Sequence, residues 1–88
     1  YRTINLNKIW DFALMTKIRD DKYLTALGKR LREVRKEKNI STYDLSYESN
    51  VSRSQINAIE RGDINTTIST LKALASALDI ELKELFDF

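Results

Sequence analysis

Apolar residues between positions 24 and 38 recur at the spacing of an amphipathic helix. They lie three or four positions apart, with basic residues between them, at Leu24, Leu27, Leu31 and Val34. This period places the apolar side chains along one side of a helix. The pattern predicts a helix over residues 24–38, and Asn39 is suited to end it in a left-handed conformation.

Two short helices are predicted next, and each has its own start signal. Each signal is a serine followed three positions later by an acidic or amide residue, in the pairs Ser41–Asp44 and Ser52–Gln55. The second pair is a capping box proper and the first is close to one, and apolar residues flank both as a hydrophobic staple does. We expect helices over residues 42–49 and 53–61, the second ended by Gly62 in a left-handed conformation.

The last third of the chain predicts a fourth helix and a short fifth helix. Thr67 is the candidate N-cap of the fourth helix, whose apolar face is Ile68, Leu71, Leu74, Ala75 and Leu78. The fifth helix is expected from Ile80, Leu82, Leu85 and Phe86, although Glu81 before it is a mediocre cap. No strand pattern competes over residues 24–88, so the predicted fold class is all-α, a compact five-helix domain.

Residues 1–23 are interpreted as an N-terminal extension of the domain at 24–88. Apolar residues repeat there at helical spacing, at Leu6, Ile9, Trp10, Ala13 and Leu14. Ile4 and Leu6 alternate as in a strand. Three interpretations stay open: a packing extension, a dimer-forming arm, or a cloning remnant. The aromatic side chains of Trp10 and Phe12 favour the arm, because they are costly to expose to water.

The connection between the helices at 42–49 and 53–61 is only three residues long, Asn50 to Ser52. Such a short connection forces two helices to cross at a steep angle. The crossing needs a small residue within the first helix and a turn residue that tolerates positive φ, and Ser46 and Asn50 meet these needs. The segment is therefore predicted to be a helix-turn-helix that presents residues 53–61 to the major groove of DNA.

The net charge of +2 hides an asymmetry along the chain. Residues 1–23 carry five basic and three acidic side chains, residues 24–62 carry eight and five, and residues 63–88 carry two and five. The balance is therefore +5 up to Gly62 and −3 after it. An anion-facing front and a neutral-to-acidic back would give this division.

The composition argues against several classes of protein. The chain has 88 residues, enough for one domain, and no cysteine or histidine, so neither a metal nor another cofactor is expected. It has no nucleotide-binding loop and no carboxylate set at catalytic spacing, so we expect no enzyme. No apolar run approaches the roughly 20 residues of a membrane span. Because the chain also has no cysteine, a reducing, cytoplasmic location is the expectation.

The chain from Leu27 to Phe86 resembles the Xre or lambda-repressor-like family of phage repressors, restriction-modification controller proteins and antitoxins. The matching stretches are LGKRLREVRKEKNIS, YDLSYESNVSRSQINAIERG and ISTLKALASALDIELKELF. The resemblance implies a sequence-specific DNA-binding transcriptional regulator whose helix at 53–61 recognises a short palindromic operator. It implies double-stranded DNA as a partner and a homodimer, for which the fourth and fifth helices can supply the interface. It also implies a protein encoded by a bacterium or a phage.

The resemblance also implies which residues contact DNA. Base edges would be read by Arg53, Ser54, Gln55 and Asn57. Helical phase agrees in part, because a helix with Ile56 and Ile59 facing the core turns Ser54, Asn57, Ala58 and Arg61 outward. The arginine at the first turn can make a two-pronged contact to guanine.

Phosphate contacts are expected from Thr42, Tyr43, Ser52 and Arg61, assisted by the amino-terminal ends of the two helices. The sequence departs from the family here, since Thr42 replaces the usual glutamine that grips the backbone. The neighbouring Tyr43 or a water molecule can compensate. Ser46 for alanine and Asn50 for glycine are milder departures.

Two further expectations concern structure and partners. Arg35 and Glu60 occupy positions that form an inward-facing ion pair in several phage repressors, so we assign them a structural role. The alternative function is an antitoxin-type interaction module that binds a toxin partner and regulates its own synthesis by binding DNA.

Overall fold

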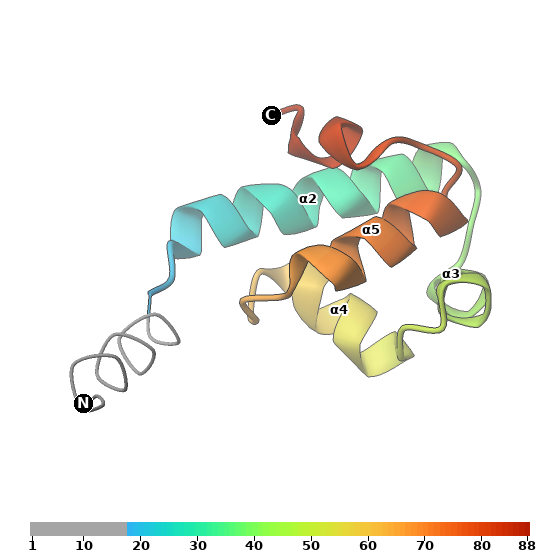
Figure 1. The fold of residues 1–88 in the computed structure, drawn as a ribbon, viewed down its shortest axis with the longest axis horizontal. Coiled ribbons are helices and arrows are strands. Elements are labelled where there is room, and N and C mark those ends of the chain that lie inside the picture. The colour runs from blue at the N-terminus through green and yellow to red at the C-terminus, as the bar shows by residue number, and fades with distance from the viewer. Residues whose placement is uncertain (1–17) are drawn as a thin grey trace, which may run out of the picture.

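The computed structural model describes residues 18–88, and every regular element in this part is helical (Figure 1). The elements are α2 (Asp21–Glu37), α3 (Thr42–Ser49), α4 (Arg53–Arg61), α5 (Ile68–Ala77) and the 3₁₀ helix η1 (Leu82–Phe86). The predicted all-α class is confirmed. None of these helices is long and apolar enough to cross a membrane. The interpretations of residues 1–17 fall outside the described residues.

Each α-helix begins at a side chain that accepts a hydrogen bond from a backbone amide of the first turn. The three predicted caps do so: Ser41 accepts from Asp44 at 3.0 Å, Ser52 from Gln55 at 3.2 Å, and Thr67 from Thr70 at 3.1 Å. The prediction that the first helix begins at Leu24 is wrong. Asp20 caps it by accepting from the amide of Tyr23 at 3.0 Å, so α2 starts at Asp21.

The turns after the helices use left-handed residues. Asn39, Asn50 and Gly62 have φ values of 56°, 63° and 75°, at the positions expected from the sequence. Gly62 has a second constraint, because a Cβ there would lie 2.8 Å from the backbone of Thr25 in α2. Asp79 also has positive φ, 58°, and lets the chain turn from α5 toward η1.

The fifth helix is present as a 3₁₀ helix of five residues. A segment this short favours 3₁₀ geometry over a full α-helix. Its start is better stabilised than Glu81 alone suggests, because the carboxylate of Glu84 accepts from the backbone amide of Glu81 at 2.9 Å. The two glutamates therefore hold the entry to η1 together.

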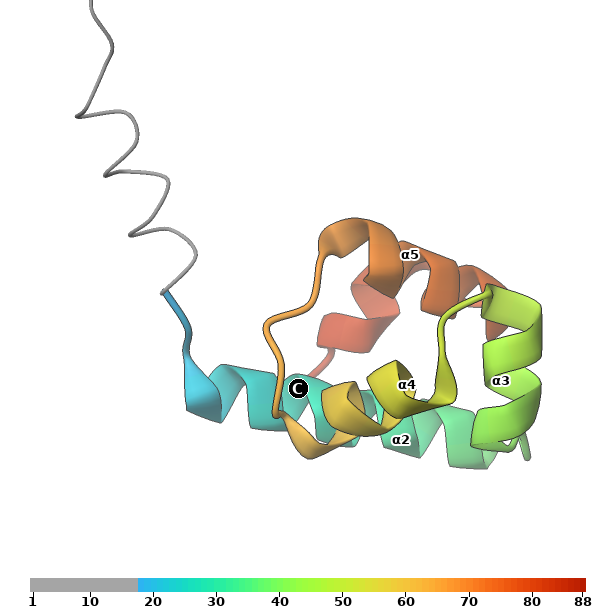
Figure 2. The same ribbon diagram turned by 90° about the horizontal axis from the view of Figure 1, so that it is seen from below.

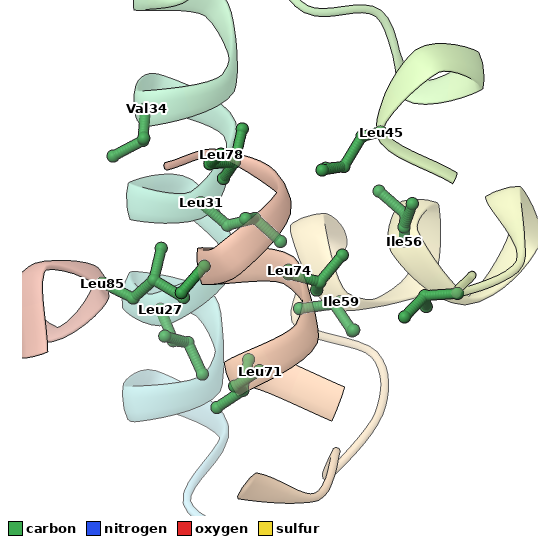
Figure 3. Close-up of a cluster of buried hydrophobic side chains, with 12 residues drawn as sticks. Leu27, Leu31, Val34, Leu45, Ile56, Ile59, Leu71, Leu74, Leu78 and Leu85 are labelled. Carbon is green, nitrogen blue, oxygen red and sulfur yellow. The ribbon is translucent and has the colours of Figure 1, made fainter. Parts of the chain in front are cut away.

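One apolar core joins all five elements (Figure 3). Its largest fully buried side chains are Leu31, Leu45, Ile56, Ile59, Leu74, Leu78 and Leu85. Figure 2 shows α3 standing steeply against α4, as the three-residue connection requires. In Figure 1, α4 and the C-terminal end lie on opposite sides of α2 and α5. The core thus fixes α4 at one side of the molecule.

Gly28 determines how closely α2 and α4 cross. It is buried, and a Cβ built on it would lie 2.2 Å from the carbonyl oxygen of Ile59 and 2.6 Å from that of Glu60. Real Cβ atoms essentially never approach so closely, so only glycine fits this crossing. This role of Gly28 was not predicted from the sequence, because nothing in the helical pattern indicates which helix packs against it.

Candidate nucleic-acid interface

The nine residues of α4 form one buried face and one exposed face. On the inner side, Ile56 and Ile59 are 0% and 2% exposed. On the outer side, Arg53, Ser54 and Asn57 are all exposed, as a period of 3.6 residues requires. The structure therefore brings three of the four candidate base-reading residues together on one face. The fourth, Gln55, is half-buried at the edge of that face.

Arg53 lies at the start of α4 beside an aromatic ring of α3. Its guanidinium carbon Cζ is over the ring of Tyr43, 5.8 Å from the ring centroid. Tyr43 itself is 62% exposed. Among residues 18–88, no carboxylate pairs with Arg53 and no hydrogen bond holds its side chain. Its N–H donors therefore stay available to a partner on the outer side of α4.

The amino-terminal ends of α3 and α4 differ in their fitness to bind an anion. The first turn of α4 holds no acidic residue, whereas that of α3 holds the exposed Asp44. Ser52 accepts from an amide through its hydroxyl oxygen, and the hydroxyl hydrogen can still be donated. Thr42 is half-buried in the first turn of α3. The start of α4 is thus better suited than the start of α3 to bind an anion.

The expected phosphate contact Arg61 already has a partner. Its Nε donates to Oδ2 of Asp63 at 2.7 Å, and the two side chains are 62% and 56% exposed. The backbone of this loop is fixed to the segment before α2: Arg19 donates to the carbonyl of Asp63 at 3.2 Å, and Asn65 donates to that of Ile18 at 2.7 Å. A phosphate reaching Arg61 would compete with Asp63. None of these loop contacts was anticipated from the sequence, although the two-residue spacing of Arg61 and Asp63 was visible.

Arg35 and Glu60 form a two-pronged ion pair between α2 and α4. Nε of Arg35 lies 2.7 Å from Oε2 of Glu60, and the second terminal nitrogen lies 3.0 Å from Oε1. The side chains are only 11% and 7% exposed. Arg35 also donates to the carbonyl of Ile40 at 3.0 Å, so it joins α2, α4 and the turn before α3. The pair secures the inner side of α4 against the long helix.

The basic residues of α2 do not all face solvent equally. Lys29, Arg32 and Lys36 are exposed. Arg30 is half-buried and donates to the carbonyl of Glu84 in η1 at 2.9 Å. It therefore fixes the C-terminal segment onto α2.

Comparison with known proteins agrees with this architecture. The family model HTH_3, described as helix-turn-helix, matches residues 31–85. The chain belongs to this helix-turn-helix family. The relatives of the chain are Xre or lambda-repressor-like proteins, as the resemblance predicted. This family assignment covers α3, α4 and the turn between them, which are the elements that carry the candidate interface.

The relatives of this chain include both transcriptional regulators and restriction-modification controller proteins. The chain is 42% identical over 62 residues to the transcriptional regulator SlrR of Bacillus subtilis. The aligned residues cover 69% of this chain and 41% of SlrR. The chain thus spans less than half the length of that relative. The crystal structure of the restriction-modification controller protein C.AhdI from Aeromonas hydrophila is similar, with 43% identity and a TM-score of 0.70 over 72% of this chain and 96% of that one.

A third relative was solved with DNA. The restriction-modification controller protein C.Esp1396I forms a tetramer in complex with its natural 35 base-pair operator. This helix-turn-helix chain is 29% identical to it, with a TM-score of 0.64 over 74% of this chain and 96% of that one.

Proposed function

We propose that this chain is a sequence-specific DNA-binding transcriptional regulator that recognises a short palindromic operator through α4. The observation that carries the proposal is the division of α4. Its inner face is fixed to the core, while its outer face exposes polar side chains and a guanidinium that has no carboxylate partner among residues 18–88. The operator complex of C.Esp1396I supports it. In this role the protein binds DNA and catalyses no reaction. It acts in the cytoplasm of a bacterium, where the DNA lies.

In this proposal the base edges are read from the first two turns of α4. Arg53 donates two hydrogen bonds to guanine, a contact worth about 1–3 kcal/mol of discrimination against another base. Ser54, Gln55 and Asn57 read the neighbouring bases, and an asparagine or glutamine side chain suits adenine. These assignments come from the family resemblance, and the exposure of Arg53, Ser54 and Asn57 supports three of them.

The phosphate contacts surround this helix. Ser52 and the amide end of α4 bind one phosphate, Thr42 and Tyr43 bind beside it, and Arg61 binds at the other end of α4 after exchanging Asp63 for a phosphate oxygen. These contacts fix the protein on the duplex and carry no sequence information. They therefore contribute to affinity for all DNA alike.

The proposed functional unit is a homodimer. A helix of nine residues is about 13–14 Å long, so it spans only about four base pairs of rise 3.4 Å. Two copies related by a two-fold axis place two such helices on the two halves of a palindrome. The exposed apolar side chain of Ile68 on α5, 64% exposed, is available to such an interface.

Selection of bound fragments from a pool of random duplexes tests the proposed function. The purified 88-residue chain is expected to enrich a palindrome, and gel-shift titration at two salt concentrations should show tighter binding to that palindrome than to a scrambled duplex. Enrichment of no sequence, or equal affinity for both duplexes, would contradict the proposal.

A further inference from the structure

The guanidinium of Arg53 lies over the ring of Tyr43. The two residues come from different helices, α3 and α4, on either side of the turn. Their separation of 5.8 Å between guanidinium carbon and ring centroid is within the roughly 6 Å range of a cation–π contact. Tyr47, one helical turn further along α3, is 80% exposed and has no such cation over its ring among the described residues. The position of Tyr43 is therefore a specific feature of this turn.

A cation–π contact leaves the hydrogen-bond donors of arginine unused. The five N–H groups of the guanidinium point outward in its plane, while a ring interacts with its face. Arg61 shows the alternative, because the carboxylate of Asp63 accepts directly from its Nε. A carboxylate beside Arg53 would compete with a base for the same donors, whereas the ring of Tyr43 does not.

We propose that Tyr43 is a positioning residue whose ring holds the guanidinium of Arg53 in place for a two-pronged contact to guanine in the major groove. This inference rests on the proposed function and adds a residue of α3 to the recognition of one base pair. The long side chain of arginine loses conformational freedom on binding, and a support that already restricts it reduces this cost. The role belongs to the ring of Tyr43; a phosphate contact of its hydroxyl is a separate role that acts on all sequences.

The test uses the full chain and two duplexes. One is the palindrome selected by the wild-type chain. In the other, the G·C pair that Arg53 is proposed to contact is replaced by A·T. The measured quantity is the ratio of the dissociation constant for the A·T duplex to that for the palindrome, so a lower ratio means weaker discrimination. Tyr43→Leu should lower this ratio by about two- to fivefold, the factor expected of a cation–π contact at an exposed site. Tyr43→Phe keeps the ring and should keep the ratio, even where loss of the hydroxyl weakens binding to both duplexes.

Two controls separate positioning from a general effect on α3. Tyr47→Leu removes a more exposed aromatic ring from the same helix and should leave the ratio unchanged. The double variant Tyr43→Leu with Arg53→Ala should have the same ratio as Arg53→Ala alone, because the ring acts through the arginine. Thermal unfolding of each variant should match that of the wild-type chain.

The outcomes distinguish this inference from the proposed function. An unchanged ratio in Tyr43→Leu, while Arg53→Ala lowers it, would overturn the role of Tyr43 and leave the proposed function standing. A ratio lowered as much by Tyr43→Phe as by Tyr43→Leu would also overturn it, since the hydroxyl would then be responsible. A wild-type chain that selects no sequence would overturn both.

Discussion

The two faces of α4 are built for different purposes from the same nine residues. On the inner face, Ile56 and Ile59 are buried and Glu60 is held by both prongs of Arg35. On the outer face, Arg53 and Asn57 are exposed. The inner face therefore determines where the helix lies, and the outer face is left to bind a partner. Substitutions on the two sides should separate into effects on folding and effects on DNA binding.

The largest expected effect is on the inner face, from Glu60→Ala. The substitution leaves the nearly buried guanidinium of Arg35 without its carboxylate, and stranding one charge of a buried pair costs about 3–5 kcal/mol in the free energy of unfolding. Urea denaturation followed by circular dichroism measures it. The double variant Arg35→Met with Glu60→Leu removes both charges and should recover much of the loss. A cost below about 1 kcal/mol for Glu60→Ala would show that the pair is solvated and not structural.

The second largest effect is expected at Gly28, where α2 and α4 cross closely. Gly28→Ala places a methyl group 2.2 Å from the carbonyl oxygen of Ile59, so α4 must move away from α2. We expect a loss of about 3 kcal/mol in the free energy of unfolding, the upper end of the usual range for overpacking. Lys29→Ala, at the next and exposed position of α2, is the matched control and should cost little. A Gly28→Ala protein as stable as this control would contradict the close crossing.

The third effect belongs to the outer face. Arg53→Ala should lower affinity for the selected palindrome by about 1–3 kcal/mol, relax the preference at one base pair, and leave the free energy of unfolding nearly unchanged. Thr42→Ala is the matched control for a phosphate contact and should weaken binding to palindrome and scrambled duplex alike. Gel-shift titration of both variants on both duplexes decides between these behaviours. Equal losses on the two duplexes for Arg53→Ala would refute its role as a base-reading residue.

The smallest effect concerns the far end of the outer face. Asp63→Asn removes the carboxylate that pairs with Arg61 and frees the guanidinium for phosphate. Because both side chains are largely exposed, we expect at most about 1 kcal/mol of tighter binding, equal for all sequences, with a steeper dependence on salt. Fluorescence anisotropy over a series of salt concentrations measures the slope. An unchanged slope would mean that Arg61 does not contact phosphate.

The parts of the fold predicted from the sequence are those that depend on local chemistry. Ser41, Ser52 and Thr67 cap helices because each hydroxyl meets an amide three residues away. Asn50 and Gly62 were predicted for their tolerance of positive φ. The cap Asp20 was not predicted, because the apolar period begins only at Leu24 whereas α2 starts at Asp21.

The remaining features depend on distances between elements far apart in the sequence. The need for glycine at position 28 follows only from the backbone of Ile59, which lies against it in the folded chain. The contact between Tyr43 and Arg53 follows from the angle at which α3 meets α4, which no spacing specifies. The Arg35–Glu60 pair was suggested by the family resemblance, and the structure supplies its geometry.

Nuclear magnetic resonance titration of the isotope-labelled chain with the selected palindrome shows whether the outer face of α4 is the surface that contacts DNA. The outer face of α4 should respond first, with the largest changes in amide shift at Arg53, Ser54 and Asn57. The C-terminal end, on the opposite side of α2 and α5 from α4, should change little when DNA binds a chain that is already dimeric (Figure 1). Unchanged shifts along α4 in a titration that saturates the chain with DNA would contradict the account.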